Sequence, residues 1–190
     1  MPRFADYHRT VIGYHGTRRS TALRIVQGLE GYHASANADD WLGHGIYFWE
    51  YAPKQAWAWA EQRRRTWSPR EDIAVLASMI RLGNCFELLD PDNLEILTRF
   101  RREYERRERQ DGRVPRENYN KSKYLDCSVF QYAYAAFQAE ADPVDTSRAV
   151  FVPSGERLWT RSGLHRHAHI QLCVRNTECI LGTWLVRPAL

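Results

Sequence analysis

The chain opens and closes with short apolar runs that are bounded by polar or turn residues, a pattern typical of β-strands. The first run, Thr10-Val-Ile-Gly-Tyr14, leads directly into His15-Gly16-Thr17, so we expect a strand that ends at a turn. A polar loop is expected from Glu30 to Asp40. Further strands are expected over 43–49, 72–82, 148–152, 167–175 and 179–186.

The segments between these runs carry helix signals. A short helix is expected over 22–26, because Ser20-Thr21 is a favoured N-cap pair and Gly28 is a favoured helix stop. Pro53 stands where a first helical residue is favoured, and it predicts a helix through Glu61.

Two longer helices are expected in the middle of the chain. One begins near Pro91 and continues through a run of charges over 101–109. The signs in this run alternate, which indicates a solvated helix face rather than a nucleic-acid site. The other helix covers 126–139 and is rich in Tyr and Ala. The apolar face of the first helix is expected at Leu94, Leu97, Phe100 and Tyr104.

Early and late strands with helices grouped between them indicate an α+β fold rather than repeating βαβ units. The 190 residues, 44% of them hydrophobic, suit a single domain over 1–190, and no repeat or linker divides the sequence. The longest apolar runs, 73–77 and 180–186, are far shorter than a membrane span, and the N-terminus has no apolar segment typical of a secretory signal. We therefore expect a cytoplasmic protein with no membrane partner.

The formal net charge of +4 permits a nucleic-acid partner without requiring one. Of the 27 basic residues, 24 are Arg, which pairs with carboxylates and phosphates better than Lys does. A GC-rich genome is the simpler explanation of that surplus. The four cysteines form no C-x-x-C pair, so we expect reduced thiols rather than a disulfide or zinc framework.

Two glycine-containing motifs are candidate ligand sites, and each lies beside a predicted strand. Glycine lets a ligand approach the backbone because no Cβ blocks it. Tyr47 offers a flat face on which a planar ring can stack. Taken singly, each motif is explained as well by a structural His or by aromatic side chains that fill the core. The motifs are His15-Gly16-Thr17 and Gly43-His-Gly45-Ile-Tyr47-Phe48.

In this order and about thirty residues apart, the two motifs resemble those of the ADP-ribosyltransferase superfamily, in the branch that includes diphtheria toxin and the poly(ADP-ribose) polymerase catalytic domain. An Ala-rich helix after the second motif adds to the resemblance, which covers residues 11–60 well and the final strands more loosely. It implies a split antiparallel β-sheet core with helices packed on the sheets. It also implies NAD as the bound substrate.

The resemblance further implies roles for single residues. The Gly16 backbone would hold the nicotinamide carboxamide, the Thr17 hydroxyl would help to hold the dinucleotide, and His15 would hold the adenosine ribose. Tyr47 would stack on the nicotinamide ring. The implied NAD-binding set is His15, Gly16, Thr17, Gly45, Tyr47 and Phe48.

The family's third element is an acid on a late strand, and here the best counterpart of that strand, 169–174, places Gln171 at the acid's position. The implied catalytic set is therefore His15, Tyr47 and Gln171. Gln171 can grip a ribose hydroxyl but supplies no negative charge for a developing cation. Single transfer is therefore favoured over polymer synthesis. Glu178 and Glu156 are nearby in sequence and are further candidates for the missing acid.

Two other patterns are candidate sites. His165, His167 and His169 share one face of a predicted strand, but three His along one strand rarely converge on an ion, so we expect no metal. The segment Trp67-Ser-Pro-Arg70, preceded by Arg63-Arg64-Arg65, is a candidate edge for acceptor recognition. A helix C-terminus whose Arg residues complement the helix dipole is an equal alternative.

The function expected from the resemblance is NAD-dependent mono-ADP-ribosylation of a macromolecular acceptor, either protein or nucleic acid, with release of nicotinamide. Bacterial relatives of this size often act as toxins or phage-defence effectors, so an antitoxin protein is a candidate partner. Two alternatives stay open. One is an RNA 2′-phosphotransferase, which also uses NAD and a His-Gly-Thr motif, and for which Arg166 is a weak indication. The other is an NAD- or ADP-ribose-binding module without catalysis, to which Gln171 points.

Overall fold

The computed structural model describes residues 7–67, 71–152 and 156–187, except for the side chains of Tyr7 and His8. Over these residues the chain forms one mixed sheet of seven strands and four α-helices, which confirms the α+β class. The strands are β1 (Tyr7–Arg18), β2 (Ile46–Glu50), β3 (Ile73–Gly83), β4 (Cys85–Glu87), β5 (Thr146–Phe151), β6 (His169–Val174) and β7 (Ile180–Leu185). The helices are α1 (Arg19–Val26), α2 (Pro53–Trp67), α3 (Pro91–Gln110) and α4 (Tyr124–Ala139), with a short 3₁₀ helix η1 (Thr177–Cys179).

The strand order across the sheet is β4-β5-β6-β2-β1-β3-β7. Neighbouring strands are antiparallel except at one edge, where β4 and β5 run parallel. The sheet is therefore mixed, and the expected antiparallel pairing does not extend to that edge. The sequence did not predict β4, which is short and follows the turn at Gly83, where a φ of 60° lets the chain leave β3.

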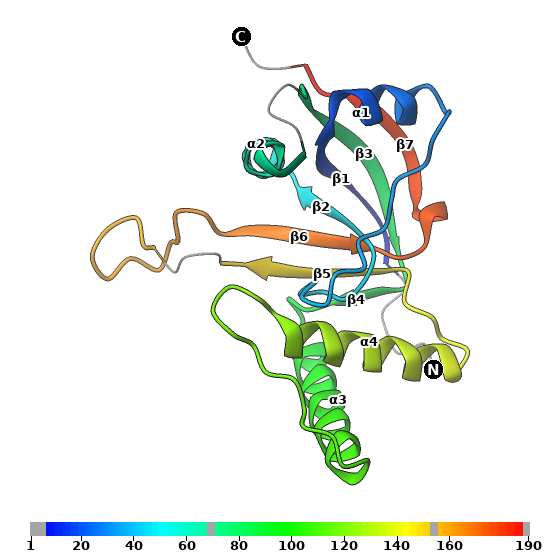
Figure 1. Ribbon diagram of the computed structural model, residues 1–190, viewed down its shortest axis with the longest axis vertical. Helices are drawn as coiled ribbons and strands as arrows, with labels where there is room; N and C mark the ends of the chain where they lie inside the picture. Colours follow the sequence, from blue (N-terminus) through cyan, green and yellow to red (C-terminus); the bar gives the residue numbers. More distant parts are fainter. Residues whose placement is uncertain (1–6, 68–70, 153–155, 188–190) are drawn as a thin grey trace.

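The sheet consists of two parts that meet at β2. All five residues of β2 pair with β6, whereas β2 pairs with β1 only at Gly13↔Glu50 and Tyr14↔Trp49. In Figure 1 the strands β1, β3 and β7 run steeply, while β5 and β6 lie across the view. The two parts therefore separate on one side of β2, and this separation positions the candidate site.

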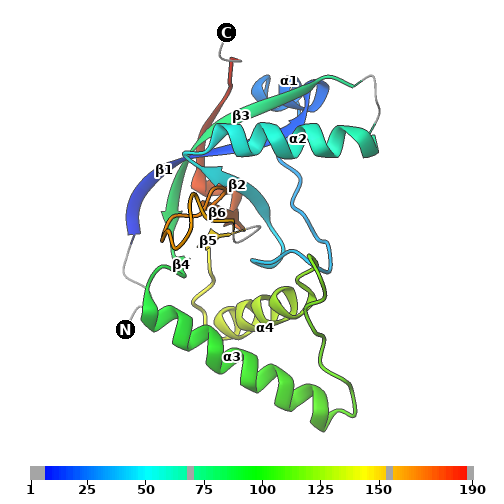
Figure 2. The same cartoon turned by 90° about the vertical axis from the view of Figure 1, so that its left-hand side faces the viewer.

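Each part of the sheet carries its own pair of helices, as Figure 2 shows. Helix α2 packs so closely on β1 that a Cβ at Gly16 would overlap the carbonyl oxygen of Ala56 and lie 2.9 Å from the Cβ of Ala60. Helices α3 and α4 cover the part that contains β4 and β5, where Phe86 and Phe137 are fully buried. The two helix pairs thus leave the junction at β2 between them.

Several element ends differ from the sequence prediction. Helix α1 begins at Arg19, and the Ser20 hydroxyl donates to Glu71 instead of capping the helix. Gly28, with a φ of 71°, lies just beyond the end of α1, close to the expected stop. Helix α2 extends to Trp67, because the basic residues after Glu61 continue it. In α3 an ion pair joins Arg101 and Glu105 at 2.8 Å, as expected for alternating charges on a solvated face in this part of the run.

A chain of ion pairs links the strands, and all of its side chains are buried except that of Arg9, which is half exposed. Arg148 on β5 donates to Glu50 on β2 over 2.7 Å and to Glu87 on β4 over 2.7 Å. Glu87 also accepts from Arg9 on β1 at 3.0 Å. Because both carboxylates are matched by guanidinium groups, their charges are tolerated in the interior. Within the described part of the chain, no helix has the length and apolar character needed to cross a membrane.

Candidate functional site

A cavity of about 480 Å³ lies where β1 and β2 part. Six of the seven residues implied by the family resemblance line it, although they come from three strands and the turn before β2. They are His15, Gly16, Thr17, Gly45, Tyr47 and Gln171. The tertiary structure therefore brings together residues that are up to 156 positions apart in the chain.

The backbone of Gly16 borders the cavity because β1 is no longer paired with β2 there, although it still pairs with β3. Backbone groups of alternate residues in an antiparallel strand point to opposite neighbours. The N–H of Tyr51 donates to the carbonyl oxygen of Ile12, so the N–H and C=O of Gly16 face the same side. The β1–β2 pairing ends at Tyr14, which leaves this side of Gly16 without a strand opposite it.

His15 spans the gap between the two strands. Its Nδ1 lies 2.8 Å from the carbonyl oxygen of Tyr47. Because a carbonyl oxygen only accepts, Nδ1 carries the proton and Nε2 of the neutral ring is an acceptor. Desolvation by burial lowers the pKa of His15, which favours this neutral form. The ring is further fixed by an edge contact with Tyr32 and a tilted contact with Phe48.

The two motif glycines are explained first by packing. The Gly16 Cβ position is occupied by α2, and a Cβ at Gly45 would lie 2.5 Å from the sulfur of Cys173 and 2.8 Å from the carbonyl oxygen of Val174. Protein atoms therefore fill the side of each glycine on which a Cβ would stand. What they offer the cavity is their backbone.

Tyr47 is held by two hydrogen bonds to the turn that precedes its strand. Its hydroxyl donates to the carbonyl oxygen of Gly43 at 2.8 Å and accepts from the N–H of Leu42 at 2.9 Å. Burial raises the pKa of Tyr47 far above its usual value, so the phenol stays protonated. The side chain therefore offers the cavity a fixed ring rather than an acid or a base.

Gln171 is oriented by a chain of hydrogen bonds. The indole Nε1 of Trp41 donates to Oε1 of Gln171 at 2.6 Å, which assigns the amide orientation because indole N–H is only a donor. The amide nitrogen then faces Nε2 of His169 at 3.3 Å. His169 Nδ1 donates to the carbonyl oxygen of His167, so Nε2 is the acceptor. Burial lowers the pKa of His169, which preserves this arrangement.

Phe48 does not belong to the cavity. Its side chain is fully buried in the core formed with Val11 and Leu172, on the side of β2 opposite Tyr47. Adjacent residues of a strand point to opposite faces, so Tyr47 and Phe48 cannot both line one cavity. The prediction of Phe48 as an NAD-binding residue is therefore corrected to a core residue.

Neither candidate for the missing acid reaches the cavity. Glu178 is exposed on η1, and Glu156 pairs with Arg166 at 3.3 Å in the loop that joins β5 to β6. Figure 1 shows this loop projecting away from the sheet. The carboxylates that line the cavity are Asp39 and Asp40, which the sequence had placed in a plain polar loop. Their only sequence signal was the acidic pair directly before Trp41.

A wall of tryptophans forms another side of the cavity. Trp59 lies between Trp49 and Trp67. Its ring centroid is 5.6 Å from that of Trp49 and 6.0 Å from that of Trp67. Arg63 lies over the ring of Trp59 at 5.7 Å, and Arg18 over that of Trp67 at 5.4 Å. The expected acceptor edge thus borders the cavity at Arg63 and Trp67. The rest of that edge, 68–70, lies outside the described residues.

The three alternating histidines play separate parts. His169 orients Gln171, whereas the backbone of His165 pairs with Arg157 in the projecting loop. Among the described residues, no group of three His, Cys, Asp or Glu side chains is arranged to hold a metal ion. Arg166, the indication for a 2′-phosphotransferase, pairs with Glu156 in the same loop and does not line the cavity.

Comparisons of the chain with protein-family models, with curated proteins and with solved structures find no match.

Proposed function

We propose that the chain is an NAD-dependent mono-ADP-ribosyltransferase that transfers ADP-ribose to a macromolecular acceptor and releases nicotinamide. One observation carries the proposal: residues from both motifs and Gln171 line a single cavity, namely His15, Gly16, Thr17, Gly45, Tyr47 and Gln171. The sheet, divided at β2, is also the kind of split core that the family resemblance implies. The specific ADP-ribosyltransferase fold is part of the same proposal.

The groups around the cavity suit the two ends of NAD. The N–H and C=O of Gly16 face the cavity side and complement a carboxamide, which both donates and accepts hydrogen bonds. The fixed ring of Tyr47 suits stacking on a planar nicotinamide. Neutral His15 offers Nε2 as an acceptor for a ribose hydroxyl.

In NAD the nicotinamide ring carries a positive charge. The C–N bond between ribose C1′ and the ring breaks with its electron pair moving to the ring nitrogen, so nicotinamide leaves as a neutral molecule and positive charge develops at C1′. The chain's residues hold the carboxamide at Gly16 and the ring at Tyr47, which fixes the leaving group. Gln171 holds the nicotinamide ribose through its remaining amide N–H and carbonyl lone pair. Such positioning leaves one face of C1′ open to the acceptor nucleophile, which forms the new bond and loses its proton.

The uncharged side chain of Gln171 favours transfer of a single ADP-ribose unit over synthesis of a polymer. An uncharged amide gives less stabilisation to a developing cation than a carboxylate does. Asp39 and Asp40 line the same cavity, but the carboxylate of Asp40 already accepts from Ser35 and from the backbone N–H of Asn37. We therefore propose single transfer rather than polymer synthesis. A toxin or phage-defence role with an antitoxin partner follows from the resemblance alone and belongs to the same proposal.

The proposal is tested with NAD labelled in its adenylate half. The purified protein is incubated with this NAD in host-cell lysate, and the products are digested with protease or nuclease. Macromolecular label that depends on the protein supports the proposal, and the digestion that releases it identifies the acceptor. Tyr47→Phe, which keeps the ring, should retain transfer, whereas Tyr47→Ala should lose it.

Two other results would contradict the proposed transferase and indicate a different function. Nicotinamide release without transferred label, in lysate and with added protein or nucleic acid, would make the protein an NAD glycohydrolase. Intact NAD that still binds, measured by calorimetry, would favour a module without catalysis. Both results contradict a transferase.

A further inference from the structure

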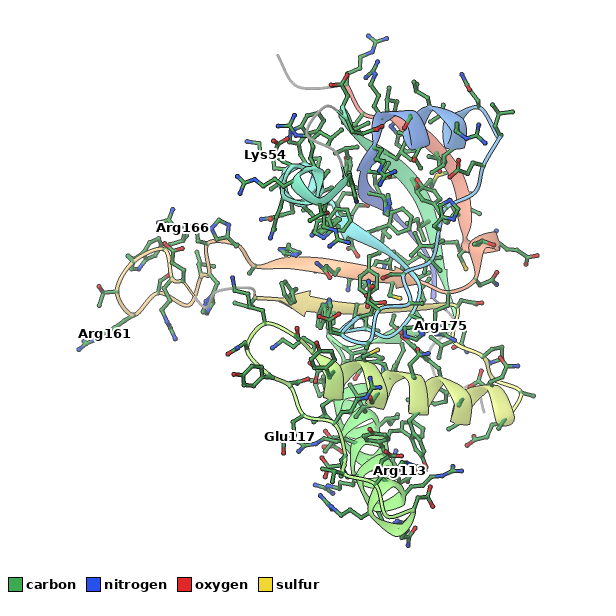
Figure 3. All side chains as sticks on the ribbon, in the orientation of Figure 1. Lys54, Arg113, Glu117, Arg161, Arg166 and Arg175 are labelled. Carbon is green, nitrogen blue, oxygen red and sulfur yellow. The ribbon has the colours of Figure 1, made fainter. Side chains whose placement is uncertain are left out.

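A second cavity, of about 590 Å³, lies beside the first and is lined by α3, α4, the loop that joins them and the loop that precedes β2. Its polar side chains are mostly hydrogen-bond donors. In Figure 3 Arg113 projects beside the end of α3. The basic residues that line this cavity are Arg107, Arg113, Arg116 and His44.

The carboxylate in this cavity is already engaged. Glu108 accepts from Nη2 of Arg113 at 2.7 Å and from its Nε at 3.1 Å, and this contact lowers the pKa of Glu108. Arg107 and Arg116 have no hydrogen bond or ion pair with a carboxylate among the described residues. The cavity therefore presents two free guanidinium groups, which suit an anion that accepts several hydrogen bonds.

His44 adds a further donor. Its backbone N–H donates to Oε1 of Gln131 at 3.0 Å, which turns the amide nitrogen of Gln131 towards Nδ1 of His44 at 2.9 Å. Nδ1 is thus an acceptor, and the ring proton lies on Nε2. An imidazole N–H and two guanidinium groups together match the oxygens of a phosphodiester.

One loop separates this cavity from the first. Ala36 and Ala38 line the second cavity, whereas Asn37 and Asp39 line the first. On the far side of the first cavity stand the partly exposed rings of Trp59 and Trp67. Aromatic rings next to cationic side chains are the usual platform for the bases of single-stranded nucleic acid.

We propose that the second cavity binds the phosphodiester backbone of a single-stranded nucleic acid, whose neighbouring nucleotide enters the first cavity, while bases beyond it stack on Trp59 and Trp67. This inference rests on the proposed transferase activity, and it identifies nucleic acid as the acceptor of ADP-ribose. Hydrogen-bond donors for phosphate, the first cavity and the tryptophan rings follow one another across the surface. This order favours a nucleic-acid acceptor over a protein acceptor. Strand binding itself requires no NAD.

Binding is measured by fluorescence anisotropy, without NAD, using labelled mixed-sequence RNA and DNA single strands of about twelve nucleotides and a duplex of equal length. We expect the single strands to bind more tightly than the duplex, and the RNA and DNA arms identify which strand is preferred. Affinity should fall with salt, because each bound phosphate releases counterions.

Three variants assign the contacts. Arg107→Gln and Arg116→Gln should each weaken binding about tenfold and reduce the slope of log affinity against log salt by about 0.7, the value for one phosphate on a single strand. Trp67→Ala should weaken binding about tenfold or more with the slope unchanged, because stacking releases no counterions. The matched control is Arg81→Gln, at an exposed position on β3. Arg81 is six residues, or roughly 20 Å, along the strand from Val75, which pairs with Gly16.

Absence of single-strand binding at low salt, in protein whose far-UV spectrum and melting temperature are normal, would overturn this proposal. Equal effects of Arg116→Gln and Arg81→Gln would overturn it as well. The two proposals fail separately. Strand binding without any nicotinamide release contradicts only the transferase, whereas transfer to protein without strand binding contradicts only the nucleic-acid acceptor.

Discussion

The imidazole Nδ1 of His15 lies 2.8 Å from the carbonyl oxygen of Tyr47, across the gap where β1 and β2 cease to pair. A side chain thus connects two strands at a point where backbone hydrogen bonds have ended. The contact holds the first motif against the second while the backbone of Gly16 borders the open space. The cavity therefore exists because β1 and β2 pair at only two positions.

We expect acid to destabilise the protein through His15. The pKa of His15 is lowered in the folded state, so the unfolded chain, with a His pKa near 6.5, binds its proton first as pH falls. This contribution to stability is complete above about pH 6.5 and is lost below it, by at most about 1.4 kcal/mol per pH unit. Urea unfolding between about pH 7.5 and 5.5 measures the loss. His15→Asn, which keeps a donor for Tyr47 but does not titrate, should show a weaker pH dependence, and an equal dependence would exclude His15 as the cause.

We expect two substitutions of Gln171 to change the rate of nicotinamide release in opposite directions. Gln171→Glu adds a negative charge while Trp41 still has an acceptor, so nicotinamide release should rise about tenfold or more. Gln171→Ala removes the ribose contact and should lower release about a hundredfold. Both are measured as initial rates of nicotinamide formation. Unchanged rates in both variants would remove Gln171 from the site.

Gly16→Ala should destabilise the fold. The added methyl group would overlap the carbonyl oxygen of Ala56 on α2, so the helix must move from β1, at a cost of about 2–3 kcal/mol. The control is Gly182→Ala on β7, where a Cβ has no neighbour within 4 Å and the change should stay below about 0.5 kcal/mol. Urea unfolding compares the two variants, and equal stability would contradict the packing account.

Arg148→Met should be among the most damaging substitutions in the sheet. It leaves Glu50 unpaired and Glu87 with Arg9 alone, and breaking such a buried pair costs about 3–5 kcal/mol. Arg101→Met removes an exposed partner of Glu105 and should have little effect. Thermal unfolding of the two variants tests this contrast. Comparable melting temperatures would show that the buried pairs contribute little.

Much of the secondary structure was predictable because it follows from local pattern. The apolar runs and the proline at the start of α2 and α3 predicted most strands and helices to within a few residues. The end of α2 was placed too early, because its last residues are basic and carry no apolar periodicity. Strand β4 was missed because three residues give no periodic signal, and only their pairing with β5 makes them a strand.

The sequence by itself identified four candidate site residues, because His15, Gly16, Tyr47 and Gln171 stand in recognisable positions of strand motifs, but it assigned no role to Asp39 and Asp40. Only the tertiary structure decided how those groups are used. Strand alternation placed Tyr47 in the cavity and Phe48 in the core, and packing of α2 and β6 explained the glycines. The Trp41 contact that orients Gln171 and the second arginine-lined cavity join residues far apart in the chain. Such contacts depend on how the sheet divides and curves, and no local pattern of residues encodes that geometry.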